Sequence, residues 1–504
     1  LRLWLWRQDL PLYRDIGGEN GKAYPEVASA LMGTAVPIVR VNEKGELVVS
    51  VAVPIQRMRA VLGSLLLSTR GGDIDAIVTA ERLAIVRVSL FAVGVTGMLL
   101  FKTNLPPVIS VWDKIGGLVA NSAWNSLNSW SLTALPLFIL MGEILFRTAI
   151  STRLLNGLVP WLSNIPGRLL HINVVACSLF AAVSGSSAAT TATVGKITLD
   201  ELSKRGYDRS LAIGSLAGAG TLGFLIPPSL IMIIYGVLSD TSIGKLFIGG
   251  VIPGLLLASF YSLYIMLRAK MKPSIVPAAK ETYSTAEKLA SLKELVPVLL
   301  LVFVVLGGIY LGITTPTEAA AIGVLGALIL ALAYRNLTLQ NFREALLQAV
   351  QTTAMICLII AGAAFLAQVV GFVGIARGIS EYIVSLNMSP YMLLVVLGIM
   401  YLILGMILDG ISIVVMTLPI VLPIVTSAGF DALWFGIFLV IMVELSQITP
   451  PVGFSLFVIQ GIAYEPVVNI IKATLPFLVI MILMVVLLTF FPELVLYLPN
   501  KMIQ

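Results

Sequence analysis

Two proline pairs interrupt the apolar part of this sequence at matching places. Ile226-Pro227-Pro228-Ser229 breaks one apolar segment, and Thr449-Pro450-Pro451-Val452-Gly453 breaks another. The second pair follows the first at an offset of 223 (450 − 227). Because proline removes a backbone donor and cannot continue the helical ladder, each pair predicts a helix break inside a segment that is otherwise apolar enough for a membrane.

A polar run precedes each proline pair. Ser184-Gly185-Ser186-Ser187-Ala188-Ala189-Thr190-Thr191 lies upstream of the first pair, and Gly405-Met406-Ile407-Leu408-Asp409-Gly410-Ile411-Ser412 lies upstream of the second, at an offset of 221 (405 − 184). Interrupted segments at corresponding places in two halves are the best sequence pointer to a transporter binding site. We therefore predict two repeats, at about 130–260 and 346–496, each with a polar hairpin facing a broken helix.

The composition is that of a membrane protein. Of 504 residues, 58% are hydrophobic and 12% are charged, and the mean hydropathy is +1.00. A soluble domain has about 25% charged residues. Most apolar residues fall in blocks of roughly 18–25, the length of a helix that crosses the bilayer. These blocks predict an all-α polytopic protein surrounded by lipid, with apolar segments near 84–101, 108–121, 131–149, 170–198, 210–238, 245–267, 295–313, 317–333, 346–373, 391–408, 411–426, 432–446, 450–463 and 468–496.

The positive charge is concentrated between apolar blocks. The net charge is +6, and the basic residues gather in the loops 268–293 and 335–345. The positive-inside rule predicts that both loops are cytoplasmic and that the short turn 314–317 between them is periplasmic. The positive net charge therefore reflects membrane topology, and no nucleic-acid partner is expected.

Catalytic chemistry has little support in the sequence. The two cysteines, Cys177 and Cys357, lie far apart inside apolar stretches, and His171 is the only histidine. A disulfide framework, a transition-metal site and histidine catalysis are therefore not expected. No Gly-x-x-x-x-Gly-Lys-Ser/Thr motif is present, so we expect neither ATP hydrolysis nor another enzymatic activity.

Asp409 is the most informative single residue. It lies in the run Tyr391–Ser427, which contains no other Asp, Glu, Lys, Arg or His. An aspartate near the bilayer centre costs about 2.5–3.5 kcal/mol on insertion scales, so it normally has a partner or an ion. Two interpretations stay open: an ion ligand, or a carboxylate at a hairpin tip near water. The position beside Gly410 and Ser412 favours the ion ligand.

The breaks also predict which groups bind ions and substrate. Freed backbone carbonyls and Ser, Thr and Asp oxygens suit a sodium ion, and the N-termini of half-helices suit an anionic substrate. As sodium ligands we predict Asp409, Ser186 and Thr449. The full predicted binding set is Ser184, Gly185, Ser186, Ser187, Gly223, Pro227, Pro228, Gly405, Asp409, Gly410, Ser412, Thr449, Pro450 and Pro451. The alternative for each segment is a proline kink whose hydroxyls bond back to the preceding turn.

Three further carboxylates lie in or beside apolar segments. Glu318 follows Pro316 at a predicted helix start, where a carboxylate favours the helix dipole. Glu143 and Glu444 are interpreted as structural anchors that are hydrogen-bonded between helices.

The motifs resemble those of the large membrane subunit of tripartite ATP-independent periplasmic (TRAP) transporters. Besides the two polar runs, the matching stretches are Leu135-Pro136-Leu137-Phe138-Ile139-Leu140-Met141-Gly142-Glu143, Gly218–Ser229 (GAGTLGFLIPPS), Thr315-Pro316-Thr317-Glu318-Ala319-Ala320, Pro419–Pro423 and Ile448-Thr449-Pro450-Pro451-Val452-Gly453. They occur in the family's order and span about residues 95–500. The resemblance is therefore specific and covers most of the chain.

The resemblance implies a fold, a mechanism and partners. The fold would be an inverted repeat with two re-entrant hairpins and an elevator-like moving domain in the bacterial inner membrane. The activity would be sodium-coupled uptake of a small organic acid, such as a dicarboxylate or a sugar acid, with sodium as coupling ion and no other cofactor. The partners would be a small four-helix membrane subunit and a periplasmic solute-binding protein that delivers the substrate.

The first part of the chain departs from this family. Residues 1–82 are predicted to form a small extracytoplasmic α+β region, with a hairpin in 29–53 around Asn42-Glu43-Lys44-Gly45. This region resembles the stimulus-sensing part of a bacterial sensor histidine kinase, and Glu81–Phe101 resembles that kinase's second span. The permease domain is expected over 83–504. Either the two parts are a genuine fusion or the coding sequence was joined artificially, and the join inside one apolar stretch favours the second explanation.

Two other functional classes remain as alternatives. A membrane sensor or receptor is suggested by the segment 1–82, although the many membrane segments that follow it exceed what a sensor needs. A channel would not require paired hairpins, and its transport would not depend on sodium. The main hypothesis is a secondary transporter driven by an ion gradient.

Overall fold

The structure is a computed structural model of the whole chain. It describes residues 27, 37–41, 47–57, 60–68, 95, 111–148, 150–277, 283–335, 337–374, 378, 389–406, 408–450, 453–463 and 465–502. The chain divides into two units: Leu1–Val86 with Gln460–Val467, and the remainder. The predicted turn around Asn42 and most of the predicted span Glu81–Phe101 lie outside the described residues, as does Pro451 of the binding set.

The first unit contains a small antiparallel sheet. Its strands are β1 (Pro37–Val41), β2 (Leu47–Arg57) and β3 (Ala60–Ser68), in the order β1-β2-β3. Val41 pairs with Leu47, so the predicted hairpin is confirmed. Strand β3, which pairs antiparallel with β2, was not predicted, because its residues Ala60–Ser68 lack the apolar–polar alternation of the first two strands.

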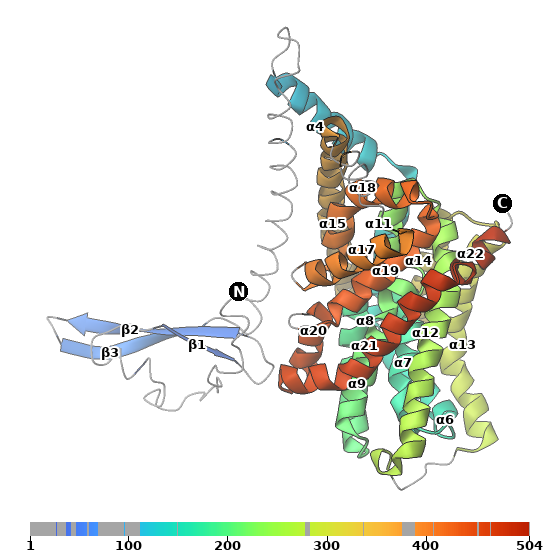
Figure 1. Cartoon of the computed structure of the whole chain (residues 1–504). Helices are drawn as coiled ribbons and strands as arrows, with labels where there is room; N and C mark the ends of the chain where they lie inside the picture. Colours follow the sequence, from blue (N-terminus) through green and yellow to red (C-terminus); the bar gives the residue numbers. More distant parts are fainter. Residues whose placement is uncertain are drawn as a thin grey trace. The chain divides into compact units, whose positions relative to one another are not determined.

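The second unit, taken together with the end of α20 that the division assigns to the first, is helical (Figure 1). Its α-helices are α4 (Val111–Leu127), α5 (Ala134–Arg147), α6 (Ile150–Leu162), α7 (Ile172–Ser184), α8 (Ser187–Lys204), α9 (Arg209–Gly220), α10 (Leu222–Leu225), α11 (Leu230–Ser239), α12 (Ile243–Met271), α13 (Thr285–Tyr310), α14 (Pro316–Ala333), α15 (Leu339–Val373), α17 (Pro390–Gly405), α18 (Gly410–Ser427), α19 (Ala432–Gln447), α20 (Phe454–Ala463), α21 (Val467–Phe490) and α22 (Glu493–Asn500). Short 3₁₀ turns are η4 (Trp130–Thr133), η5 (Arg168–His171) and η6 (Pro273–Ile275).

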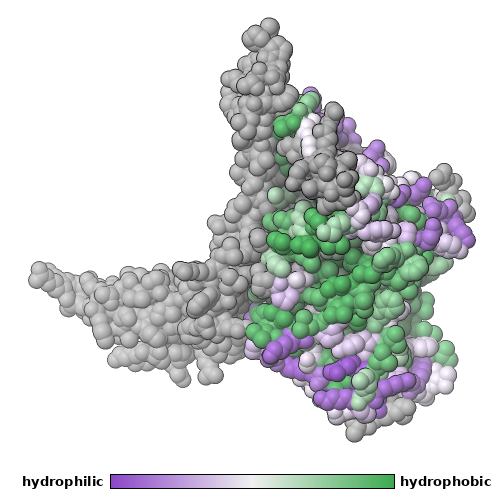
Figure 2. Space-filling model, viewed as in Figure 1, coloured by the Kyte–Doolittle hydropathy of each residue, from purple (hydrophilic) through white to green (hydrophobic). Residues whose placement is uncertain are grey.

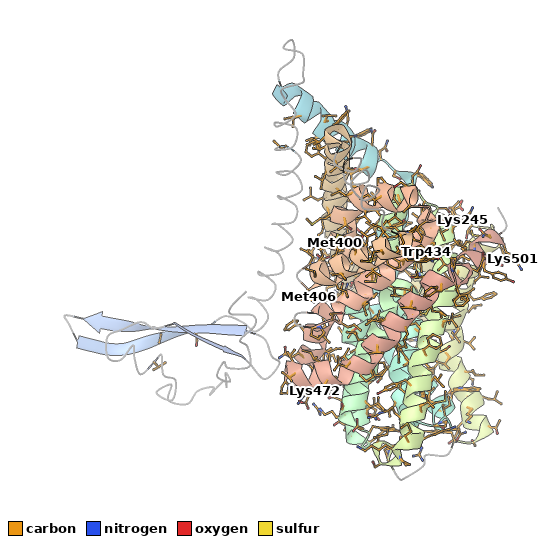
Figure 3. All side chains as sticks on the ribbon, in the orientation of Figure 1. Lys245, Met400, Met406, Trp434, Lys472 and Lys501 are labelled. Carbon is orange, nitrogen blue, oxygen red and sulfur yellow. The ribbon has the colours of Figure 1, made fainter. Side chains whose placement is uncertain are left out.

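Several of these helices are long and apolar enough to cross a bilayer. Eight such candidate spans lie in the described part of the chain. One of them, α12, has 29 residues, about 43 Å of helix. Figure 2 shows an apolar band across the helical unit, with hydrophilic residues gathered toward its ends. Lys245 and Lys501 lie near one end, and Lys472 lies toward the other (Figure 3).

Two of the helices beside the breaks are too short to span the membrane by themselves. Helix α7 has 13 residues and α11 has 10, whereas about 20 are needed to cross the hydrocarbon layer. The apolar segment 210–238 has its predicted break at Ile226–Ser229, between α10 and α11, and a further boundary at Thr221, between α9 and α10. Unwound backbone between such half-helices is tolerated only where protein or a cavity surrounds it. Here the protein surrounds it, since every residue from Leu211 to Gly236 is buried.

The two halves share helix-capping residues as well as breaks. Ser186 caps α8 and Asp409 caps α18, at an offset of 223 (409 − 186). Asp208 caps α9 and Asp431 caps α19, again at an offset of 223 (431 − 208). The proline pairs have the same offset. The predicted internal repeat therefore extends from sequence motifs to the start points of the equivalent helices.

Glu318, Glu143 and the two cysteines all lie within helices. Glu318 closes a capping box with Thr315 at the start of α14, as the dipole argument predicted. Glu143 forms an ion pair with Arg147, N–O distance 3.1 Å, so its main partner lies on its own helix α5. Cys177 and Cys357 are free thiols.

Candidate functional site

The first hairpin tip is tied down by its own polar groups. Ser184 ends α7, and its hydroxyl lies 2.7 Å from the Thr190 hydroxyl oxygen. Gly185 has a left-handed backbone, with φ of 60°, a conformation that glycine adopts without strain. The Ser186 hydroxyl accepts from the Ala189 N–H at 3.5 Å and caps α8. The predicted residues thus form the turn between two half-helices.

The first broken helix packs directly on this tip. The Leu230 N–H, at the start of α11, donates to the Gly185 carbonyl at 3.2 Å. A methyl group at Gly223 would lie 2.6 Å from the Ser187 backbone nitrogen, so glycine permits the close approach of the α9–α10 corner to α8. Pro227 and Pro228 separate α10 from α11, where proline contributes no N–H that would need a partner.

The second hairpin tip is organised by Asp409. Its carboxylate accepts from the Ile411 and Ser412 N–H groups, both at 3.2 Å, and from the Ser412 hydroxyl. Asp409 is thus the N-cap of α18. A methyl group at Gly405 would overlap the Ser446 side chain of α19, and one at Gly410 would lie against Gln447. The two glycines allow the hairpin to lie tightly on α19.

The second break follows α19. The Thr449 hydroxyl donates back to the Leu445 carbonyl at 2.6 Å, and Pro450 follows it. This bond is the back-bonding pattern of the alternative interpretation. The three predicted sodium ligands thus each engage within their own segment: Asp409 and Ser186 as caps, and Thr449 with the preceding turn.

The start of α11 connects the two hairpins. Leu230 bonds to Gly185 of the first tip, and a methyl group at Gly410 of the second tip would lie 3.1 Å from Ile231. Helix α11 also packs along α18. The N-termini of α8, α11 and α18 are therefore neighbours, and each carries the partial positive charge of unpaired N–H groups.

Glu444 links the second repeat to the first. Its side chain is 1% exposed and reaches from α19 into the first repeat. There it accepts from the Ser187 hydroxyl and from the Phe224 N–H at 3.0 Å. The interpretation as an anchor between helices is confirmed. The available signal was that Glu444 is the only charged residue of α19.

The groups around the site that could ligate a cation are oxygens of hydroxyls, carbonyls and single carboxylates. Within the described ranges, no three His, Cys, Asp or Glu residues gather as a metal-binding group. Such oxygens suit hard cations rather than soft transition metals. The buried helix N-termini suit an anion.

Comparison with known proteins identifies the family. The family model described as "Tripartite ATP-independent periplasmic transporter, DctM component" matches residues 76–494. The chain belongs to this family. A second model, "Stimulus-sensing domain", matches residues 1–45, which agrees with the resemblance noted in the first part of the sequence.

Curated relatives of this TRAP permease carry the same family name. The C4-dicarboxylate TRAP transporter large permease protein of Pseudomonas aeruginosa is 38% identical over 372 residues, 74% of this chain and 86% of the relative. The sialic acid TRAP transporter large permease protein of Vibrio cholerae is 31% identical over 384 residues, 76% of this chain and 89% of the relative. The relatives are named as transporter permeases, so the permease is a transporter subunit and not an enzyme.

A solved structure shares the fold. The YdaH transporter of Alcanivorax borkumensis superposes with a TM-score of 0.56 at 11% identity, covering 83% of this chain and 98% of that one. The predicted fold class, an all-α polytopic membrane protein with two re-entrant hairpins in an inverted repeat, is confirmed. The TRAP permease is an integral membrane protein, as predicted.

Proposed function

We propose that this TRAP permease couples the uptake of a small organic acid to sodium entry. The observation that carries the proposal is the pair of hairpin tips, capped by Ser186 and Asp409 at equivalent places in the two repeats and joined through the start of α11. A transporter that alternates its access across a repeat interface uses paired, interrupted segments of this kind near the bilayer midplane.

The sodium part of the proposal rests on oxygen chemistry. Each repeat has a break where backbone carbonyls leave the helical ladder, at Ile226–Ser229 and after Gln447. Hydroxyl and carboxylate groups lie near these breaks, since Ser187 packs against Gly223 and Gly410, the neighbour of Asp409, packs against Gln447. The binding set predicted from the sequence, with Asp409, Ser186 and Thr449 as tentative sodium ligands, stays the starting point for mutagenesis.

The organic-acid part rests on the helix N-termini. Those of α8, α11 and α18 meet at the hairpin tips and favour a negatively charged group. The printed names of two relatives specify a C4-dicarboxylate and sialic acid, and both compounds carry carboxylates. We therefore propose a carboxylate-containing substrate, with a dicarboxylate or a sugar acid as the first to test.

Membership of the family supports a proposal for the partners and for the motion. The relatives are "large permease" proteins, which supports a small four-helix membrane subunit as partner and a periplasmic solute-binding protein as the source of substrate. We place the assembly in the bacterial inner membrane. In an elevator motion, α7–α11 and α17–α19 would move together past α13 and α14.

The first experiment needs neither substrate nor partner. Thermal unfolding of the purified protein in detergent is followed across a sodium titration, with potassium keeping the ionic strength constant, for the wild type and Asp409→Asn. A ligand that binds only the folded state stabilises it by about 2.7 kcal/mol at a hundredfold excess over Kd. We expect sodium to stabilise the wild type more than potassium does, and Asp409→Asn to weaken the difference.

One result of this experiment would overturn sodium coupling. A well-folded wild type with equal stability in sodium and potassium would remove the ion from the proposal and favour proton coupling. A channel predicts that uptake in liposomes is unaffected by replacing sodium, which separates that class directly. The sensor class is favoured only by residues 1–45.

A further inference from the structure

A pocket of about 740 Å³ lies away from the hairpin tips, where three connections between helices meet. It is lined by residues 163–168 between α6 and α7, by Gly206 between α8 and α9, and by residues of the segment 273–277 that follows α12. Its volume is in the range of sites for small molecules. None of its described lining residues belongs to the binding set predicted from the sequence.

Hydrogen bonds hold the walls of this pocket together. The Asp208 N–H, at the start of α9, donates to the Ile275 carbonyl at 3.0 Å. The Arg168 guanidinium donates through Nη1 to the Pro277 carbonyl at 2.9 Å. Each bond joins segments that are far apart in the sequence. The pocket is therefore a built feature of the fold rather than a gap between independent loops.

Arg168 lines the pocket from a strained backbone. Its φ is 46°, directly after Gly167 with φ of 98°. A left-handed backbone is uncommon for a residue other than glycine, and such strain is concentrated at ligand-binding and other functional sites. The planar guanidinium matches the geometry of a phosphate group better than any other side chain does. The position of Arg168 thus suggests a phosphate-bearing ligand.

The charge around the pocket is positive. Among its described lining residues Arg168 is the charged one, and none is Asp or Glu. Lys270 and Lys272 are exposed and lie next to lining residues in the sequence. The nearby Asp208 carboxylate accepts from the Leu211 N–H at 2.7 Å, as the cap of α9. An anion entering the pocket therefore meets three cations.

The pocket lies at the level expected for lipid headgroups. Helix α12 has 29 residues, more than the roughly 20 that cross the hydrocarbon layer, and Ala269 in its last turn lines the pocket. Trp161, near the end of α6, is 42% exposed, and tryptophan is enriched at the boundary between lipid and water. Figure 2 shows hydrophilic residues gathered toward the ends of the helical unit.

We propose that this pocket binds the phosphate group of an anionic phospholipid. Arg168 contacts the phosphate, and Lys270 and Lys272 attract its charge. Basic pockets between membrane helices on the cytoplasmic side bind anionic headgroups in this way, and the positive-inside rule places the loop 268–293 on that side. The site does not depend on sodium coupling. A bound lipid would brace the connections that join α7 to α6 and α12 to α13.

The test is native mass spectrometry of the purified full-length protein in detergent, which counts bound lipids during a titration. Dioleoyl phosphatidylglycerol is the anionic probe, and dioleoyl phosphatidylcholine has the same chains and a phosphate but no net charge. Glycerol 1-phosphate, added as a competitor, has the phosphate without the chains. We expect one phosphatidylglycerol to bind at least about fivefold more tightly than phosphatidylcholine, the contribution of one cation near the membrane surface.

Charge-removing variants locate the lipid. Arg168→Asn removes the guanidinium, and asparagine tolerates the left-handed backbone, so we expect a folded protein with about fivefold weaker phosphatidylglycerol binding. The double variant Lys270→Gln/Lys272→Gln changes two exposed side chains and should weaken it about tenfold. The matched control is Lys245→Gln/Lys501→Gln, which removes the same charge near the other end of the helical unit (Figure 3) and should bind like the wild type.

Three results would overturn the proposal. Equal binding of the two lipids by the wild type would show that the pocket does not select an anionic headgroup. An equal loss in the control double variant would reduce the preference to the general charge of the protein. Displacement of the lipid by glycerol 1-phosphate at the same concentration would replace the phospholipid by a soluble phosphate ester. If Arg168→Asn fails to fold, the lysine double variant decides against the same control.

Discussion

The carboxylate of Glu444 in α19 accepts a hydrogen bond from the Ser187 hydroxyl in α8, 257 residues earlier in the chain. Both side chains are buried, Ser187 at 0% and Glu444 at 1% exposed. The same carboxylate accepts a hydrogen bond from the Phe224 N–H in α10, just before the first helix break. A residue of the second repeat thus fixes the hairpin and the broken helix of the first.

Removing the Ser187 hydroxyl should destabilise the protein. In Ser187→Ala the buried Glu444 loses one of its two donors, and leaving a buried hydrogen-bonding group unsatisfied costs on the order of 1–3 kcal/mol. Ser178→Ala is the matched control, since that hydroxyl bonds only to the Val174 carbonyl of its own helix. Thermal unfolding in detergent measures both. Equal unfolding temperatures for the two variants would contradict the importance of the Glu444 bond.

The contact between Gly405 and Ser446 predicts that a substitution at one residue can be compensated by a substitution at the other. Gly405→Ala places a methyl group on the Ser446 side chain, which should push the second hairpin off α19 and lower both folded yield and uptake. Adding Ser446→Gly makes room and should restore a large part of both. Gly371→Ala is the control, because a methyl group there meets nothing within 4 Å, and alanine favours a helix over glycine by about 1 kcal/mol. Failure of the double variant to recover would disprove the steric explanation.

Variants at two aspartate caps distinguish a loss of helix capping from a loss of ion binding. Asp409 caps α18 and Asp431 caps α19. Asp409→Ala and Asp431→Ala should each lower stability by about 0.5–2 kcal/mol, because both lose a helix cap. Only Asp409→Ala should also weaken the sodium-specific stabilisation, and Asp409→Asn should keep the cap while weakening it. A sodium response unchanged in both Asp409 variants would reduce this residue to a structural cap.

The two ends of α12 should lie on opposite sides of the membrane. Lys245 lies in the first turn, and Lys272 follows the last residue. With Cys177 and Cys357 replaced, Lys245→Cys should react with an impermeant thiol reagent from the periplasm. Lys272→Cys should react only after the cells are opened. The reverse pattern would invert the orientation that the positive-inside rule predicts.

The sequence by itself determined the features that depend on neighbouring residues. The apolar lengths predicted the spans, the proline pairs predicted the helix breaks, and Asn42–Gly45 predicted the hairpin between β1 and β2. These predictions succeeded because proline, glycine and capping residues act on the backbone within one or two turns. The offset of 223 between the proline pairs, from Pro227 to Pro450, could likewise be read from the motifs alone.

The tertiary structure decided which of these elements meet. Asp409 was recognised from the sequence, but only the structure shows that its carboxylate caps α18. Glu444 was interpreted as an anchor, but its partners Ser187 and Phe224 lie 257 and 220 residues away. The packing of α19 against the first repeat brings these groups together. A local pattern contains no information about such packing, because it depends on how side chains of distant helices fit one another.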